Sequence, residues 1–373
     1  MFTKQKGILN LMQTQTAKTN GHSTPMSDTP VYNSQMLMLK HLAAIPQRVR
    51  HELLQKRTAT GFTLGLGIVS GVLNPDSGVG AYAGDAEAYD MFEPFFGPLI
   101  ADYHGFEGNH VTDFDVSKIP TDPVDPTGEA IVSTRIRVGR NLKDYPLAPM
   151  ISKEQRLEIM NRAATTFKDA FTGDLAGEFY PLEGMDESVR QQLVNDHFLF
   201  KQGDRFLEVV GANHDWPSGR GIFHNADKTA LVWVNEEDQF RIISMQKGGD
   251  IRQVFDRIAR MVDTLNKALP FAYHEKYGAI TSCPTNLGTA MRASVHVKLP
   301  YVSQRPDFKQ LAQDLKLSIR GIHGEHSESE GGVYDISNKR RLGVSEVEAV
   351  LTMYEGIKKL LEIEREMAAK ATA

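Results

Sequence analysis

The stretch TSCPTNLGTAMRASVHVKLP (residues 281–300) sets the architecture that we expect for the chain. Its second half alternates apolar and polar side chains: Met291, Ala293, Val295 and Val297 against Arg292, Ser294 and His296. An alternation with a period of two predicts a β-strand that has one face in the core. The other face presents an arginine and a histidine, directly after a loop that holds Cys283, the single cysteine of the sequence.

Other segments predict further strands and helices around this one. Strands are predicted from β-branched and aromatic content at 130–138, 197–201, 229–235 and 240–246. Helices are predicted at 35–56 with a break at Pro46, and amphipathic helices at 152–171, 250–269 and 345–370. Because neighbouring strands follow one another with few helices between them, we expect an α+β fold with a mixed or antiparallel sheet flanked by helices.

The order of these segments predicts two domains. Residues 35–115 are expected to form a small α-helical domain, and residues 131–373 a larger α/β catalytic domain. Residues 116–130 are rich in proline and acidic residues and are predicted to be a linker. Residues 1–34 have no acidic residue before Asp28 and no arginine, so we expect a disordered tail, with an organelle-targeting signal as the alternative.

The composition argues against several classes of protein. Hydrophobic residues make up 41% and charged residues 24%, which is ordinary for a globular protein. The net charge of −5 gives no reason to expect nucleic-acid binding. No window of about 18 consecutive apolar residues is present, so we expect no membrane-spanning helix. One cysteine excludes an internal disulfide and fits a cytoplasmic protein.

Arginines recur on the predicted strands. In STRIRV (133–138), Arg135 and Arg137 are two residues apart and therefore share one face of a strand. Three more lie at strand ends or beside glycine-rich loops: Arg241, Arg292 and Arg320. Guanidinium groups suit phosphate oxygens, so several aimed at one cleft would bind a polyphosphate without a P-loop, which the sequence lacks. The alternative is that each is an ordinary exposed strand residue.

Two acidic stretches accompany the arginines. Glu236, Glu237 and Asp238 follow an apolar strand, and Glu325, Glu328 and Glu330 lie between glycines. Both stretches resemble solvated turns. A site that holds arginines and separate carboxylates nevertheless suggests two substrates, one anionic and one cationic, and a phosphate with a guanidinium would satisfy both.

Five segments carry a resemblance to a known family: CPTNLGTAMRASVHVKLP, NEEDQFRIISMQKGGD, STRIRVGRNL, WPSGRGIFHN and GEHSESEGGVYDISNKRRLG. They resemble the phosphagen kinases, which are ATP:guanidino phosphotransferases, and the similarity runs from about residue 35 to about residue 368. The resemblance implies a small α-helical N-terminal domain, followed by a large domain with an eight-stranded antiparallel sheet flanked by helices. It also implies reversible transfer of the γ-phosphoryl group of ATP to a guanidino group.

The resemblance assigns a role to each motif. The arginines that match the clamp on the ATP phosphates are Arg135, Arg137, Arg241, Arg292 and Arg320, and the histidines that match the nucleotide pocket are His197 and His296. Glu237 and Glu325 match carboxylates that grip the guanidinium and could accept its proton. Magnesium is expected to arrive with ATP or ADP, held mainly by phosphates and water, so we expect no dedicated metal site in the protein.

Cys283 matches the family's cysteine beside the guanidinium. A thiolate would complement a substrate cation, and Ser282 and Thr285 could donate hydrogen bonds to it. We therefore expect an electrostatic and positioning role, without a covalent intermediate. The alternative is a buried, inert cysteine.

The stretch DSGVGAY (76–82) resembles the specificity loop of the arginine-specific family members. The matching residues, which we expect to bind substrate, are Ser77, Gly78, Val79, Gly80 and Tyr82. Small residues let backbone N–H groups approach the carboxylate of a free amino acid. Tyr103 matches a tyrosine of the arginine-specific family members, so the resemblance implies L-arginine as substrate and phosphoarginine as product. The alternatives are another guanidino compound (taurocyamine, lombricine or creatine) or a non-catalytic anion-binding relative.

The resemblance suggests moving parts as well. Residues 77–80 and 321–332 are the candidates, and Asp76 and Arg205 are expected to pair across the two domains on closure. We expect a monomer. The sequence departs from the family pattern at Gln239, Phe240 and His323, which raises the question of whether these residues alter catalysis or loop dynamics.

Overall fold

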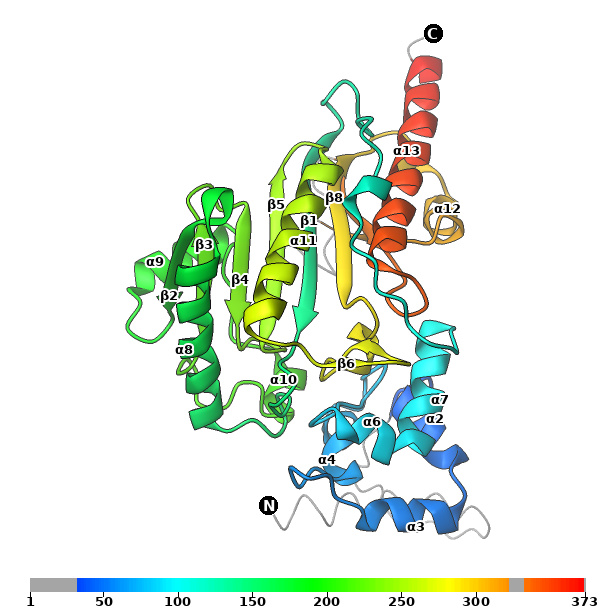
Figure 1. Ribbon diagram of the computed structural model, residues 1–373. Helices are drawn as coiled ribbons and strands as arrows, with labels where there is room; N and C mark the ends of the chain where they lie inside the picture. Colours follow the sequence, from blue (N-terminus) through cyan, green and yellow to red (C-terminus); the bar gives the residue numbers. More distant parts are fainter. Residues whose placement is uncertain (1–31, 322–331, 372–373) are drawn as a thin grey trace.

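The computed structural model describes residues 32–321 and 332–371. The N-terminal part is helical (Figure 1), with α2 (Leu37–Ala44), α3 (Gln47–Gln55), α4 (Leu64–Gly67), α5 (Val69–Leu73), α6 (Glu87–Met91) and α7 (Glu93–His104). Pro46 immediately precedes α3, which confirms the predicted break between two helices. α7 ends at Gly105, whose φ of 61° is a left-handed conformation that glycine adopts without steric cost.

Aromatic side chains form the core of this helical part. Tyr89, Phe92, Phe95 and Phe96 are fully buried, and they pack with apolar residues of α2 and α4. The same cluster includes Tyr277, Ile280 and Leu287 of the larger part. The helical part therefore packs directly on the segment that leads into the Cys283 loop.

The larger part is built on one sheet of eight antiparallel strands in the order β2-β3-β4-β5-β1-β8-β10-β9. The strands are β1 (Ile131–Arg140), β2 (Gly177–Pro181), β3 (Gly221–Asn225), β4 (Ala230–Val234), β5 (Phe240–Lys247), β8 (Met291–Lys298), β9 (Leu317–Arg320) and β10 (Val333–Asn338). A separate hairpin pairs β6 (Tyr273–His274) with β7 (Gly278–Ala279). The expected α+β class and the antiparallel sheet are confirmed.

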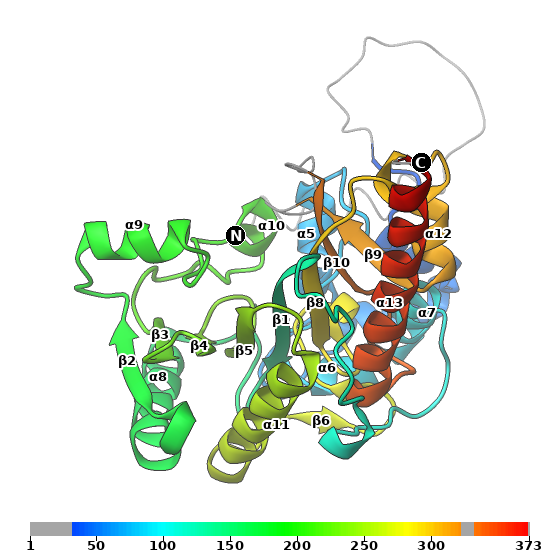
Figure 2. The ribbon, with the colours of Figure 1, turned by 90° about the horizontal axis from the view of Figure 1, so that it is seen from above.

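Helices cover one face of the sheet. They are α8 (Lys153–Ala170), α11 (Ile251–Ala268) and α13 (Glu346–Ala371). On the other side of the sheet lie α9 (Glu187–Asn195) and α10 (Arg205–Val209) (Figure 2). The short helix α12 (Phe308–Asp314) packs against β9 at the edge of the sheet. Short 3-10 turns complete the fold at Val116–Lys118, Gly173–Leu175, Pro284–Asn286 and Val302–Gln304. The predicted helices at 152–171, 250–269 and 345–370 are thus confirmed, and Ser152 forms a capping box with Gln155.

The alternation in residues 291–298 is as predicted. Met291, Ala293, Val295 and Val297 are fully buried and belong to the main core cluster, together with residues of α8, α11 and α13. Ile136 and Val138 of β1 and Ile242 of β5 join the same cluster. The alternate residues of each strand consequently point to the face that these helices leave uncovered.

One predicted strand is wrong. Residues 197–201 form no strand, because His197 has a left-handed φ of 60° immediately after α9 and breaks any extended run. Leu199 and Phe200 are buried against Trp233 and Ile243 on the open face of the sheet, so their apolar character reflects packing of a loop.

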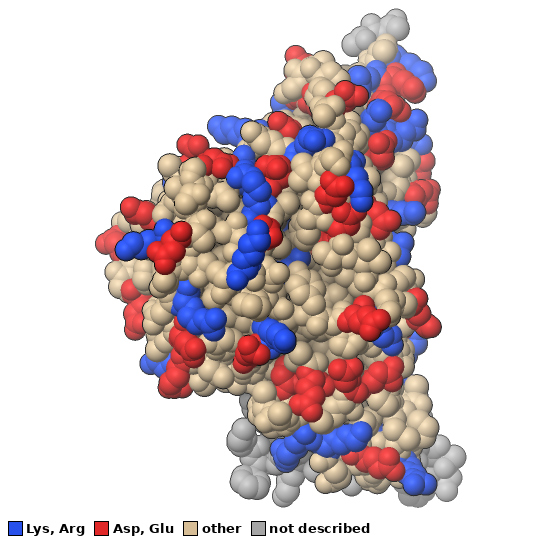
Figure 3. All heavy atoms as spheres, viewed as in Figure 1, with Lys and Arg blue, Asp and Glu red and all other residues tan. Residues whose placement is uncertain are grey.

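No helix in the described ranges 32–321 and 332–371 is long and apolar enough to cross a membrane. On the helix-covered face, Lys and Arg side chains are interspersed with Asp and Glu (Figure 3), which agrees with the modest net charge of −5. That face therefore carries no single-sign field of the kind that attracts nucleic acid.

Phe255 of α11 offers a test of how the helices hold the sheet. Its ring is fully buried and stacks on Phe114 with centroids 5.9 Å apart. Phe255→Ala leaves a cavity and should lower the free energy of unfolding by about 3–5 kcal/mol. Gln253→Ala, at an exposed position of the same helix, is the matched control and should change it little. Urea denaturation measures both, and equal midpoints would contradict the packing described here.

Candidate functional site

The predicted arginines gather on the open face of the sheet because of strand register. Arg137 of β1 lies directly opposite Arg292 of β8, and Arg135 lies opposite Ser294. Arg241 of β5 pairs with Gly139 of β1, two residues from Arg137, and so shares the face. Like charges on directly opposed residues destabilise a sheet. The arrangement therefore costs stability, and it makes sense as a binding surface for an anion.

The electrostatics of the cluster show incomplete neutralisation. Burial, together with the neighbouring charges of Arg241 and Arg292, lowers the pKa of Arg135 to about 10. Burial and the same kind of repulsion also lower the pKa of Arg137. The Nε and Nη2 atoms of Arg135 are buried and find no hydrogen-bond acceptor within residues 32–321 and 332–371. Buried donors of this kind normally have partners, so the site has spare capacity for the oxygens of an anionic ligand.

Three further residues complete the cluster: Trp233 and Asp335, which the sequence analysis did not single out, and Glu236, which it placed in an acidic stretch. The indole of Trp233 lies under two guanidinium groups, 5.7 Å from Arg135 and 5.5 Å from Arg241. Asp335 Oδ2 lies 2.9 Å from Arg292 Nη2, and Glu236 Oε2 lies 2.8 Å from Arg241 Nη2. These partners fix the orientation of the arginines. Trp233 and Glu236 reach Arg241 through the pairing of the consecutive strands β4 and β5, whereas Asp335 reaches Arg292 through the pairing of β8 with β10.

His296, His197 and Arg320 extend the cluster toward the β9 edge. Asp335 of β10 lies between His296 on β8 and Arg320 on β9 in the register of the sheet. Burial lowers the pKa of His296, and nearby Arg135, Arg292 and His197 lower it further against the effect of Asp335. The three predicted residues are thus close to the arginine cluster and line a surface that continues from it.

Glu237 stands at the junction between the arginines and the Cys283 loop. Its Oε2 accepts a hydrogen bond from Arg241 Nη2 at 3.2 Å, and its Oε1 accepts one from Asn286 Nδ2 at 3.4 Å. Burial, and then the charge of Asp238, raises the pKa of Glu237 to about 7 from an ordinary value of 4.5. A carboxyl group with a pKa near neutrality suits both binding of a cation and acceptance of a proton.

Cys283 is buried and its thiol lies 3.1 Å from Thr285 Oγ1. The expected contribution of Ser282 is wrong, because Ser282 Oγ donates to the carbonyl of Ala83. Burial and the charge of Glu237 raise the pKa of the Cys283 thiol to about 12. Burial thus disfavours the thiolate, while the hydrogen bonds of Thr285 favour it, and the thiolate expected beside a substrate cation stays a prediction.

The loop at 77–82 lies beside this pair of residues. Burial, with the nearby Cys283 and Glu237, raises the pKa of Tyr82 well above its ordinary value. Carbonyl groups hold the loop, since Leu37 N–H donates to Gly78 O and Met38 N–H to Val79 O, both at 2.9 Å.

The loop's N–H groups are arranged differently from its carbonyls. Those of Gly78, Val79 and Gly80 find no acceptor among the described residues. Gly80 has a φ of 76°, and a Cβ there would meet Met36 Sδ at 2.9 Å. Ser77 is buried at the start of the loop. A side chain would not fit at Gly80, whereas a Cβ at Gly78 would meet no atom within 4 Å.

Asp76 and Arg205 form the cross-domain pair that the sequence predicted. Arg205 Nη2 contacts Asp76 Oδ2, and Arg205 Nη1 lies 3.4 Å from Asn74 Oδ1. Both side chains of the ion pair are exposed. A pair in such a position contributes little to stability, so any role it has must concern the relative position of the two parts.

Two of the departures from the family pattern, Gln239 and Phe240, lie among the described residues, and both side chains are buried. Gln239 is buried, accepts a hydrogen bond from Leu142 N–H at 2.8 Å and donates one to Pro146 O at 2.9 Å. Phe240 lies in the main core. Neither side chain faces the arginines. His323, Glu325, Glu328 and Glu330 lie outside the described residues.

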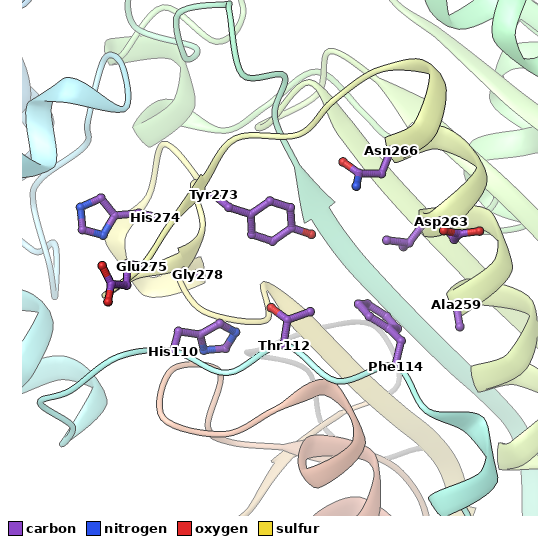
Figure 4. A pocket seen from close by; sticks show the side chains of 11 residues that line it. His110, Thr112, Phe114, Ala259, Asp263, Asn266, Tyr273, His274, Glu275 and Gly278 are labelled. Atoms are coloured by element: carbon purple, nitrogen blue, oxygen red, sulfur yellow. The ribbon is translucent and has the colours of Figure 1, made fainter.

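Another cavity, of about 570 Å³, lies on the helix-covered side. His110, Thr112 and Phe114 follow one another along one wall, α11 supplies Asn266, and the ring of Tyr273 lies between them (Figure 4). None of the predicted site residues lines it. Within residues 32–321 and 332–371, no group of three or more His, Cys, Asp or Glu side chains is arranged to hold a metal ion.

Comparison with known proteins identifies the class that this fold and site define. Residues 32–101 match the family described as "ATP:guanido phosphotransferase, N-terminal domain", and residues 158–367 match "ATP:guanido phosphotransferase, C-terminal catalytic domain". The chain belongs to the ATP:guanido phosphotransferase family, the phosphagen kinases.

Individual relatives show how similar the chain is to particular members of the family. An arginine kinase of Anthopleura japonica is 52% identical over 94% of this chain, which spans 49% of that protein. An arginine kinase of Liolophura japonica is 50% identical over 89% of this chain and 95% of its own length. The chain thus spans about half of the first relative and nearly all of the second.

Solved structures of other family members share the fold. The duplicated taurocyamine kinase of Schistosoma mansoni matches with a TM-score of 0.83 and 41% identity, over 90% of this chain and 47% of that one. A lombricine kinase structure matches with a TM-score of 0.85 and 36% identity, over 90% and 93% of the two chains. The fold therefore does not by itself distinguish between guanidino substrates.

The raised pKa of Glu237 predicts a pH dependence. Below pH 7 the carboxyl group is protonated and cannot pair with a guanidinium, so kcat/KM for the guanidino substrate should fall about tenfold per pH unit below an inflection near 7. Glu237→Gln should remove this inflection and lower the rate about 100-fold or more. A wild-type profile that is flat between pH 6 and 8 would contradict the assignment.

The same pKa predicts an effect on stability. A raised pKa means that the folded chain binds the proton more tightly than the unfolded chain, so the contribution of Glu237 is present below pH 4.5 and is lost as the pH rises through about 7. Glu237→Gln should therefore melt at a higher temperature than the wild type at pH 8, with a smaller difference at pH 5. Scanning calorimetry at both pH values measures this, and a difference that does not depend on pH would oppose it.

Charge reversal tests the Asp76–Arg205 pair. Asp76→Arg and Arg205→Asp should each lower kcat/KM severalfold without changing the melting temperature, because both groups are exposed and the pair does not hold the fold together. The double reversal rebuilds an ion pair and should recover at least half of the loss. Additive losses in the double variant would show that the two residues do not act on each other.

Proposed function

We propose that this protein catalyses reversible transfer of the γ-phosphoryl group from ATP to the guanidino group of L-arginine, giving phosphoarginine and ADP. The observation that supports this most strongly is the junction at Glu237. There a face of five predicted arginines meets a buried carboxyl group, a thiol and a loop that presents N–H donors. An anionic and a cationic substrate can meet at this point.

The proposed chemistry follows from the charges of the two halves of the site, the arginine face and the region around Glu237 and Cys283. Arg135, Arg137 and Arg292 bind the phosphates and offset the charge that spreads over the transferred group. A guanidino nitrogen attacks the γ-phosphorus, the bond from that phosphorus to the bridging oxygen of ADP breaks, and the nitrogen gives its proton to Glu237. Because the protein does little covalent work, alignment of the two substrates supplies most of the rate, on the order of 7–11 kcal/mol.

Cys283 assists this reaction as a neighbour of the cation. A guanidinium bound beside the thiol and Glu237 lowers the pKa of both groups, since each charged form is then paired. The thiol begins at a pKa of about 12, so it ionises only if the cation is close. Cys283 therefore acts electrostatically and in positioning, and forms no bond to the substrate.

L-arginine is the substrate that the specificity loop favours. The N–H groups of Gly78, Val79 and Gly80 suit a carboxylate, which a free amino acid carries at the far end from its guanidinium. Two curated relatives at 50–52% identity are named arginine kinases. Taurocyamine and lombricine remain the second candidates, because kinases for these compounds share the fold.

Magnesium fits the site as part of the nucleotide. The residues that face the phosphates are arginines, which repel a bare cation. In the described part of the chain, the carboxylates beside them already pair with Arg292 (Asp335) or with Arg241 (Glu236 and Glu237). The ion would thus be held by phosphates and water. When bound, it offsets phosphate charge during transfer.

The experiment is a measurement of ADP formation from Mg-ATP with L-arginine, taurocyamine, lombricine, creatine, glycocyamine or no acceptor. We expect strong turnover with L-arginine alone. Cys283→Ala should lose about 100-fold or more in kcat while keeping the circular dichroism spectrum of the wild type. Turnover with a different acceptor would overturn the substrate assignment. If no acceptor in the set supports turnover, the proposed reaction is overturned.

A further inference from the structure

The backbone on both sides of Cys283 is hydrogen-bonded to the N-terminal helical part. Ala83 N–H donates to Ser282 O at 2.8 Å, and the hydroxyl of Tyr89 donates to Thr281 O at 2.8 Å. These bonds hold the chain before the cysteine. Tyr89 and Thr281 are 192 positions apart in sequence, and the hydroxyl of Ser282 also donates to Ala83 O, 199 positions away, so these bonds form only when the two parts of the protein are docked.

After the cysteine, one side chain has the same role. His104 Nε2 lies 2.9 Å from the carbonyl oxygen of Pro284, and because a carbonyl only accepts, this ring nitrogen carries the proton. The other donor to Pro284 O, the N–H of Leu287, is at 3.4 Å and is weaker. Pro284 has no N–H of its own, so its carbonyl is the one backbone group through which it can be held. The carbonyl of Cys283 itself accepts from Thr281 Oγ1 at 2.9 Å and from Asn286 N–H at 3.1 Å, so His104 holds the following peptide unit.

The position of His104 makes this bond rigid. His104 is the last residue of α7, and the helix is closed by Gly105 N–H donating to Ala101 O at 2.8 Å. Its ring packs edge-on against Tyr103, with centroids 4.9 Å apart. Burial lowers the pKa of His104 to about 4, so the ring is neutral at pH 7 and the bond is not subject to titration there.

On its other side the Cys283 loop is held by the catalytic domain. Ser282 N–H donates to Asp238 Oδ1 at 3.0 Å, and Arg341 Nη1 donates to Thr285 O at 2.9 Å. The thiol is thus placed by bonds from both parts of the protein. His104 is the side chain from α7 that anchors the residue directly after Cys283.

We propose that His104 is a positioning residue for Cys283, and that its hydrogen bond to the Pro284 carbonyl makes the placement of the thiol depend on the docking of the N-terminal helical part. The proposal rests on the proposed function only where it concerns catalysis. The same end of α7 carries Tyr103, a residue by which the sequence favoured L-arginine. One helix terminus thereby connects the choice of guanidine to the position of the cysteine.

The test uses the single cysteine of the chain as its own probe, since iodoacetamide labelling reports on Cys283 alone. His104→Phe keeps the ring shape without a donor, and His104→Asn has an amide too short to reach the carbonyl. We expect both to label about fivefold faster or more, and to lose about tenfold in kcat with KM for Mg-ATP within about twofold of wild type. His104→Gln places an amide nitrogen near the former Nε2 and should restore both values.

The matched control is His41→Phe. His41 belongs to α2, and its Nε2 lies 2.9 Å from Oδ2 of Asp102, which belongs to α7. Its side chain is 11% exposed, and among the described residues it has no hydrogen bond to the Cys283 loop. Labelling and kcat should be unchanged in this variant. If His104→Phe does not fold by circular dichroism, the comparison of Asn with Gln decides.

Two results would overturn the proposal: wild-type labelling in the Phe and Asn variants, or a Gln variant as impaired as Asn. Because labelling requires no substrate, it gives an answer even if L-arginine is not phosphorylated. A failure of the proposed function is therefore distinguishable from a failure of this inference.

Discussion

The structure depends on a concentration of positive charge that the described carboxylates Asp335, Glu236 and Glu237 pair with only at Arg292 and Arg241. Antiparallel register sets Arg137 opposite Arg292, with Arg135 and Arg241 beside them, on the face opposite to the one that packs against α8, α11 and α13. The lowered pKa of Arg135 and its buried donors without acceptors are the physical signs of this imbalance. Repulsion between these arginines lowers the stability of the sheet. We infer that the arginines are kept because they bind a polyanion.

The second half of the site is assembled between the two parts of the protein. Glu237 extends from the end of the strand that carries Arg241, whereas the Cys283 loop is hydrogen-bonded to Ala83, Tyr89 and His104 of the helical part. The guanidinium subsite consequently exists only when both parts are docked. This arrangement connects closure around the substrates, which phosphoryl transfer needs in order to exclude water, to the formation of the site.

The sequence predicted what depends on local pattern and missed what depends on register. Alternation around Arg292 and the spacing of Arg135 and Arg137 correctly placed the arginines on one face. Family motifs singled out Glu237 and Cys283, which the structure places near each other, and their roles stay predictions. Trp233, Asp335 and His104 could not be found that way, because strand pairing or domain docking brings them to the site. The depth of Cys283 could not be predicted either, because no motif encodes how far a side chain is buried, and burial raises the pKa of this thiol.

The most direct test of the central claim is a ³¹P NMR spectrum of the protein incubated with Mg-ATP and L-arginine. If an anion site and a guanidinium site meet at Glu237, the γ-phosphoryl signal of ATP should decline while a new resonance of a phosphorus–nitrogen bond appears in equal amount. The signal should return to ATP when ADP is added in excess. Appearance of inorganic phosphate alone, or an unchanged ATP spectrum, would contradict the account.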